Sequence, residues 1–180
     1  MKILNNLSDV SKNPKAVTIG NFDGIHKGHQ ALINETREIS TKNNVESLIF
    51  TFNKLPKEIF SPDTIQRLYD NKIKESILSS YKIDTLLSID FNEIKDYSAG
   101  FFCEEILIKK LNVRYLIIGE NFKFGKDRSG DIEKLREYDS KNAFELMVPE
   151  LETYDGIKIS SSRVRTVSYT HLTLPTTIAV

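Results

Sequence analysis

The chain has 180 residues, 39% of them hydrophobic and 28% charged, which is ordinary for a globular domain with a sizeable core. Lysine plus arginine balances aspartate plus glutamate at 25 each, and no 18-residue apolar run occurs, so we expect neither a nucleic-acid nor a membrane partner. The single cysteine, Cys103, excludes an internal disulfide and a CxxC metal site, and its apolar helical surroundings favour a buried thiol.

The elements predicted along the chain alternate between strand and helix. The first ten residues, MKILNNLSDV, are too short and polar for a signal peptide, so we expect a cytoplasmic protein. Apolar, β-branched runs predict strands at 16–19, 47–52, 85–89, 115–118 and 144–148. Helical spacing lies between them, over residues 29–43, 63–81, 98–111 and 131–142. This alternation predicts an α/β fold, a Rossmann-like parallel sheet with helices on both faces and ligands beyond the carboxyl ends of its strands.

The stretch TIGNFDGIHKGHQ, residues 18–30, joins the first predicted strand to the first helix. A helix N-terminus offers unpaired N–H groups, and Gly28 allows a phosphate to approach closely. His26 and His29 add donors that can stabilise charge on a transferring phosphoryl group. Two other interpretations fit the same residues, namely half of a metal site, or a plain helix cap formed by either histidine.

Two later loops carry similar chemistry. GENFKFGKDRSGD, residues 119–131, follows the fourth predicted strand and mixes cations with Phe122 and Phe124. Cations suit phosphate and aromatic faces suit a planar ring, although a solvated loop anchored by its phenylalanines is the alternative. KISSSRVR, residues 158–165, combines a serine-rich helix start with arginines, a pattern also common at ordinary helix caps.

These stretches resemble a known family. GNFDGIHKGH resembles the HxGH signature of the nucleotidylyltransferase superfamily, in the form used by prokaryotic bifunctional riboflavin kinase/FAD synthetases. GENFKFG resembles the second motif of that family, and ISSSRVR resembles its ISSTxxR-type motif. The resemblance implies a nucleotidyltransferase that transfers AMP from ATP to FMN and releases FAD and pyrophosphate. Its expected partners are ATP with Mg²⁺ and FMN, and no oligomeric state is implied.

The resemblance also implies roles for particular residues. The expected catalytic residues are His26, His29, Asn121, Ser162 and Arg165. The expected ATP-binding residues are Gly20, Asn21, Phe22, Asp23, Gly28, Lys158 and Ser161. Asp23 could instead bind metal or shape the turn, and no protein metal ligand is assigned. The expected flavin-binding residues are Pro56, Phe60, Phe102 and Phe124, of which Phe102 fits the core better. Lys54 and Leu55 replace the Pro-His pair of the family's TFxPHP stretch, which we expect to affect flavin affinity more than ATP binding.

The domain organisation follows from the same resemblance. Residues 1–166 are expected to form the FMN adenylyltransferase domain, without the riboflavin kinase domain that usually follows and hence without flavokinase activity. Residues 167–180, VSYTHLTLPTTIAV, resemble translated adapter sequence and are expected to be non-native. Two alternatives stay open. One is another HxGH enzyme, a cytidylyltransferase or a pantetheine-phosphate adenylyltransferase; the other is a flavin- or nucleotide-binding module without turnover.

Overall fold

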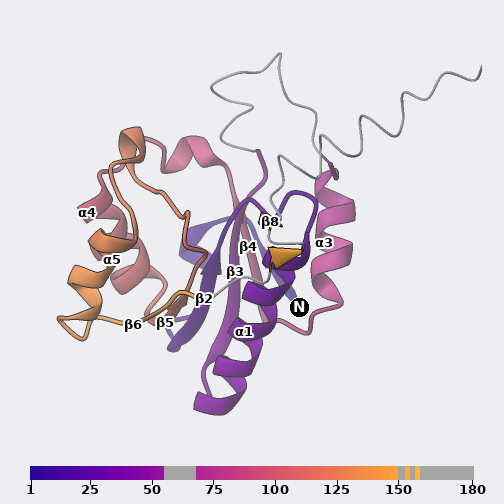
Figure 1. Ribbon diagram of the computed structural model, residues 1–180, viewed down its shortest axis with the longest axis horizontal. Helices are drawn as coiled ribbons and strands as arrows, with labels where there is room; N and C mark the ends of the chain where they lie inside the picture. The colour runs from indigo at the N-terminus through magenta and orange to yellow at the C-terminus, as the bar shows by residue number, and fades with distance from the viewer. Residues whose placement is uncertain (55–67, 150–152, 155–156, 159–180) are drawn as a thin grey trace, which may run out of the picture.

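A computed structural model describes residues 1–54 and 68–149, together with the backbone of 153–154 and 157–158. Within these residues one sheet contains six parallel strands in the order β1-β4-β3-β2-β5-β6 (Figure 1). The strands are β1 (Lys2–Leu4), β2 (Lys15–Ile19), β3 (Glu46–Phe52), β4 (Thr85–Ile89), β5 (Val113–Ile117) and β6 (Glu145–Met147). A separate antiparallel pair contains β7 (Thr153–Tyr154) and β8 (Ile157–Lys158).

All five strands predicted for the parallel sheet are confirmed, with ends that differ by at most two residues. The edge strand β1 was not predicted. It has only three residues, of which only Leu4 is buried, so it carries no apolar run. Its pairing with β4 creates the strand, because the register from Lys2 opposite Thr85 to Leu4 opposite Leu87 supplies its partners.

Helices cover both faces of the sheet, as predicted. The helices are α1 (Lys27–Asn43), α3 (Asn71–Ser79), α4 (Ala99–Phe101) and α5 (Ile132–Asp139), and α4 continues as a π-helix over Phe102–Lys110. Figure 1 shows α1 and α3 against one face and α4 and α5 against the other. Residues 63–67 of the helical segment predicted over 63–81 lie outside the described residues.

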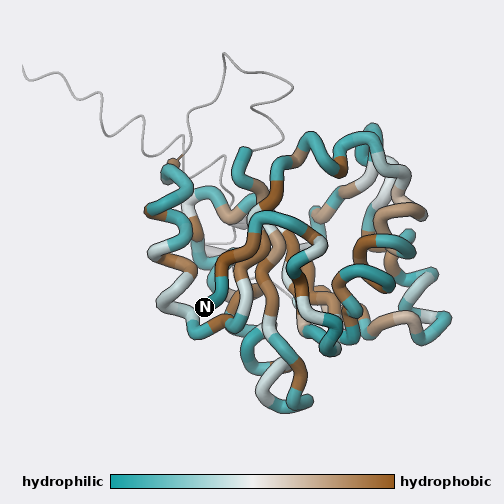
Figure 2. Tube along the Cα trace, turned by 180° about the vertical axis from the view of Figure 1, so that it is seen from behind, coloured by the Kyte–Doolittle hydropathy of each residue, from teal (hydrophilic) through white to brown (hydrophobic). Residues whose placement is uncertain are grey.

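Side chains on the two faces of the sheet pack into separate parts of the hydrophobic core. In β2 every residue is buried, and alternate side chains point in opposite directions. Val17 and Ile19 join the cluster that packs on the α4 side, whereas Ala16 packs with Leu32 of α1. Figure 2 shows the resulting run of hydrophobic strands between more hydrophilic helices. The Cys103 side chain is buried in the first cluster, and burial raises the pKa of its thiol to about 12, which confirms the prediction of a structural thiol.

The strand order reverses its direction at one place in the sheet, between β2 and β5. The chain moves outward from β2 through β3 to β4 and then crosses back to place β5 on the other side of β2. The connections therefore diverge above β2 and β5, at the carboxyl edge where parallel sheets bind ligands. The turn after β2 carries the HxGH-like stretch, and the loop after β5 carries the GENFKFG stretch; residues of both line one pocket at this edge.

Candidate active site

The turn after β2 leads directly into α1. The Gly20 N–H donates to the Phe50 carbonyl oxygen at 3.0 Å, which ties the start of the turn to β3. The chain then passes through left-handed backbone at Phe22 (φ 48°) and Gly24 (φ 81°). His26 is the N-cap of α1, and its side-chain nitrogen Nδ1 accepts from the His29 N–H at 3.3 Å. The helix-cap interpretation therefore holds for His26, and the cap fixes the ring at the N-terminus of α1.

The two imidazoles stack on each other at this helix end. Their ring centroids lie 3.7 Å apart, with the planes inclined by 17°. Burial lowers the pKa of His26, and burial together with the charge of His26 lowers the pKa of His29 to about 3. Both rings are therefore neutral at pH 7. Because Nδ1 of His26 accepts a hydrogen bond, its neutral ring carries the proton on Nε2, which makes that atom a donor.

The lowered pKa of His29 predicts a pH dependence of stability. The unfolded chain binds a proton on this ring below pH 6.5, whereas the folded chain stays neutral until about pH 3. Protonation therefore favours the unfolded state, and the free energy of unfolding should fall as pH drops from 6.5 towards 3. Urea unfolding at several pH values should show a shallower fall for His29→Gln than for the original chain. If the free energy of unfolding depends on pH in the same way for both chains, the His29 imidazole is not desolvated in the fold.

The side chains in the middle of the turn, Phe22 and Asp23, are buried. The ring of Phe22 is fully buried among apolar side chains of α1, β3 and α3, with its centroid 5.1 Å from that of His29. The Asp23 carboxylate is also buried and accepts from the Leu68 N–H at 3.0 Å. A Cβ on Gly24 would come within 2.5 Å of Leu68. The Asp23 carboxylate thus helps to shape the turn, and the Phe22 side chain packs in the core.

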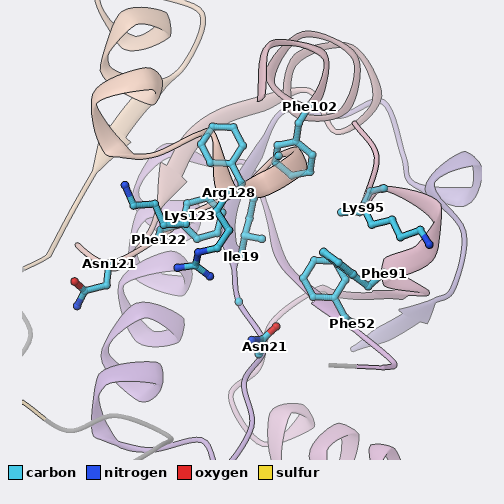
Figure 3. Close-up of a pocket in the computed structure, with 14 residues that line it drawn as sticks. Ile19, Asn21, Phe52, Phe91, Lys95, Phe102, Asn121, Phe122, Lys123 and Arg128 are labelled. Carbon is cyan, nitrogen blue, oxygen red and sulfur yellow. The ribbon is translucent and has the colours of Figure 1, made fainter. Parts of the chain in front are cut away.

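Gly20 and Asn21, at the start of the same turn, line an apolar pocket of about 250 Å³. Five phenylalanines line it: Phe52, Phe91, Phe102, Phe122 and Phe124. Figure 3 shows rings converging from the ends of several strands, with polar groups of Asn21, Asn121 and Arg128 at the margin. The volume falls just below the roughly 300–1,000 Å³ of typical ligand pockets. We therefore expect it to enclose a planar ring and to leave the rest of a ligand outside.

The pocket brings together five of the residues to which the resemblance assigns a role: Gly20, Asn21, Phe102, Asn121 and Phe124. The pocket is also lined by four residues to which the motifs assign no role: Phe52, Phe91, Ile94 and Lys95. Their positions in the sequence could have indicated this role, because Phe52 is the last residue of β3 and the other three follow the carboxyl end of β4. Phe102 is both core and pocket wall, since its side chain is only 3% exposed.

The loop after β5 is closed on itself. Phe124 and Gly130 exchange two backbone hydrogen bonds, of 3.0 and 2.9 Å. A Cβ on Gly130 would lie 2.6 Å from the Phe124 ring, so only glycine lets that ring turn inward. Lys123 pairs with Asp131 at 3.0 Å, and Asn121 is exposed at the pocket margin. The loop therefore presents its phenylalanines to the pocket instead of forming a solvated surface turn.

Several predicted residues lie outside the described part of the chain. They are Pro56, Phe60, Ser161, Ser162 and Arg165. Lys158 ends β8, but only its backbone is described. Among the described residues no group of three or more His, Cys, Asp or Glu side chains could hold a metal ion. No helix in this part of the chain has the length and hydrophobicity needed to cross a bilayer.

Comparison with known proteins identifies the family. A family model described as FAD synthetase matches residues 8–163. The chain belongs to the FAD synthetase family. Curated relatives named bifunctional riboflavin kinase/FMN adenylyltransferase include one from Buchnera aphidicola, 39% identical over 168 residues, and one from Escherichia coli K12, 31% identical over 170. These alignments cover 90% and 92% of this chain, but 53% and 54% of the relatives, so the chain spans about half their length.

Solved structures support the same fold. A Streptococcus pneumoniae chain described as a macrolide-efflux protein matches with a TM-score of 0.77 and 27% identity, covering 92% of this chain and 54% of that one. Pantothenate synthetase from Thermus thermophilus matches with a TM-score of 0.56 at 15% identity, covering 91% and 67%. The second likeness concerns the fold alone. Together with the six-stranded parallel sheet, these structures confirm the predicted α/β fold with helices on both faces of the sheet.

Proposed function

We propose that this member of the FAD synthetase family transfers AMP from ATP to FMN, giving FAD and pyrophosphate. One observation carries the proposal: the turn that leads into the histidine-capped N-terminus of α1 also lines an aromatic pocket through Gly20 and Asn21. The pocket suits a flavin ring and the helix end suits a triphosphate. Residues 1–166 would form the transferring domain. ATP and FMN are metabolites of the cytoplasm, which is where we place the reaction.

The ATP side of the site is assigned to the start of α1. The Gly28 backbone and the positive end of the helix would hold phosphate oxygens, with the Nε2–H of His26 as a further donor. His29 would stabilise charge as it develops at the α-phosphorus. The motif near the C-terminus would hold the departing phosphates through Lys158, Ser161, Ser162 and Arg165.

The flavin side is assigned to the aromatic pocket. Phe124 and Phe102 offer ring faces, and Phe52 and Phe91 complete the wall opposite the loop after β5. Asn121 at the margin would supply a hydrogen bond to a polar edge of the flavin or to its phosphate. Pro56 and Phe60 remain proposed flavin contacts from the segment after β3.

The reaction is an in-line attack of an FMN phosphate oxygen on the α-phosphorus of ATP, with pyrophosphate leaving. Two anions must meet, so the protein has to align them and reduce their repulsion. Mg²⁺ would accompany ATP on its phosphate oxygens. The described residues provide no acidic cluster for a resident ion, and the Asp23 carboxylate is engaged with Leu68.

The decisive experiment supplies the purified chain with Mg²⁺, ATP and FMN and separates the products by chromatography. We expect FAD and pyrophosphate in equal amounts. Parallel reactions with CTP and glycerol phosphate, and with ATP and phosphopantetheine, should give no product. Turnover in either parallel reaction with none in the first would favour the alternative enzymes. Binding of ATP and FMN without pyrophosphate would identify a binding module.

A further inference from the structure

Arg128 differs from the other cations around the pocket. Its guanidinium lines the pocket, and no hydrogen bond or ion pair engages that group within the part of the chain that the structure describes. Lys123 is paired with Asp131. Figure 3 shows the Lys95 ammonium across the pocket and directed away from the rings, whereas the Arg128 guanidinium is drawn at the pocket margin between Asn121 and Asn21. Arg128 therefore offers the pocket a planar cation that no acidic group among the described residues neutralises.

The backbone holds this side chain in an unusual conformation. Asp127 and Arg128 both have left-handed backbone, with φ of 55° and 57°, and Gly125, two residues before Asp127, has φ of 72°. Residues other than glycine avoid this region unless the surroundings enforce it. Here the Phe124–Gly130 bridge closes the loop, and the Lys126 N–H donates to the Tyr97 carbonyl oxygen at 2.7 Å. Strain maintained in this way is typical of residues that must face a ligand.

The apolar part of the pocket cannot distinguish a phosphorylated flavin from an unphosphorylated one. Its phenylalanines would contact the ring system, which FMN and riboflavin share. A phosphate on the flavin must extend towards Asn21 to reach ATP at the start of α1. A guanidinium on that side can form two parallel hydrogen bonds to a phosphate, a geometry that lysine cannot match.

We propose that Arg128 binds the phosphate of FMN and thereby selects FMN over riboflavin at the adenylyl-transfer site. The inference rests on the proposed function. The side chain would hold the attacking phosphate at the pocket margin and partly neutralise it before it meets ATP. No covalent step is assigned to Arg128.

Titration of flavin fluorescence with the full chain, using FMN and riboflavin in parallel, tests the assignment. For Arg128→Gln we expect FMN affinity to fall by roughly tenfold to a hundredfold and riboflavin affinity to stay the same. Arg128→Lys should recover only part of the loss. Arg128→Gly removes the side chain at a φ that glycine adopts freely, so a loss there cannot come from backbone strain. Lys126→Gln, in the same loop but outside the pocket, should bind both flavins like the original chain.

The outcomes separate this inference from the function on which it rests. Equal weakening of FMN and riboflavin in Arg128→Gln would overturn the phosphate assignment, as would unchanged FMN affinity or an equal effect of Lys126→Gln. In each of those cases the original chain would still form FAD. If the original chain binds neither flavin and forms no FAD, the proposed function fails together with the inference. The melting temperature of every variant shows that folded proteins are being compared.

Discussion

His29→Ala should lower the rate of FAD formation at saturating substrate by roughly 10²–10³-fold. The imidazole lies at the start of α1, stacked on His26 at 3.7 Å, where charge would develop at the α-phosphorus. A donor that acts mainly on the transition state affects turnover more than binding. ATP affinity should therefore fall much less, since the amides of the first helical turn remain. Turnover and ATP affinity measured on one preparation check both expectations.

The structure also predicts the stability of His29→Ala. The cap of α1 uses the backbone N–H of His29, so alanine preserves it. Only the ring contacts with His26 and Phe22 are lost, which should lower the free energy of unfolding by about 1 kcal/mol. His26→Ala is the matched control, because it removes the cap itself and should lower stability by about 0.5–2 kcal/mol. Unchanged activity per folded molecule in His29→Ala would exclude a catalytic role.

Phe22→Ala should lower the free energy of unfolding by about 3–5 kcal/mol. The ring is fully buried among Ile33, Ile49, Leu78 and other apolar side chains, so truncation leaves a cavity that these neighbours fill only partly. Urea unfolding measures the loss. ATP affinity of the molecules that remain folded should change little, because the side chain does not face the ligand.

An exposed phenylalanine provides the comparison. Phe101 is 46% exposed and packs only against Tyr97 among the ring contacts of the described residues, so Phe101→Ala should cost about 1 kcal/mol or less. If Phe22→Ala is as stable as Phe101→Ala and binds ATP much more weakly, the Phe22 side chain contacts the nucleotide and is not a core residue. That result would require the turn to open when the nucleotide binds.

The sequence by itself determined the main elements and the motif chemistry. The strand runs at 16–19, 47–52 and 85–89 are buried on both faces, and such strands carry a continuous apolar signal that needs no tertiary context. The alternation with helices then implied a parallel sheet. Gly28 and the paired histidines marked the start of a helix because the signals for helix ends are local. The family could be identified from the same short stretches.

Only the tertiary structure decided which residues share a site. Phe22 and Phe124 both lie in glycine-containing turns, yet one ring enters the core and the other lines the pocket, because the crossovers place different neighbours around them. Phe91 and Arg128 come from loops that are distant in sequence and converge only when β5 returns beside β2. Local sequence encodes backbone preference and hydrophobicity, whereas the direction in which a loop side chain points depends on packing between distant segments.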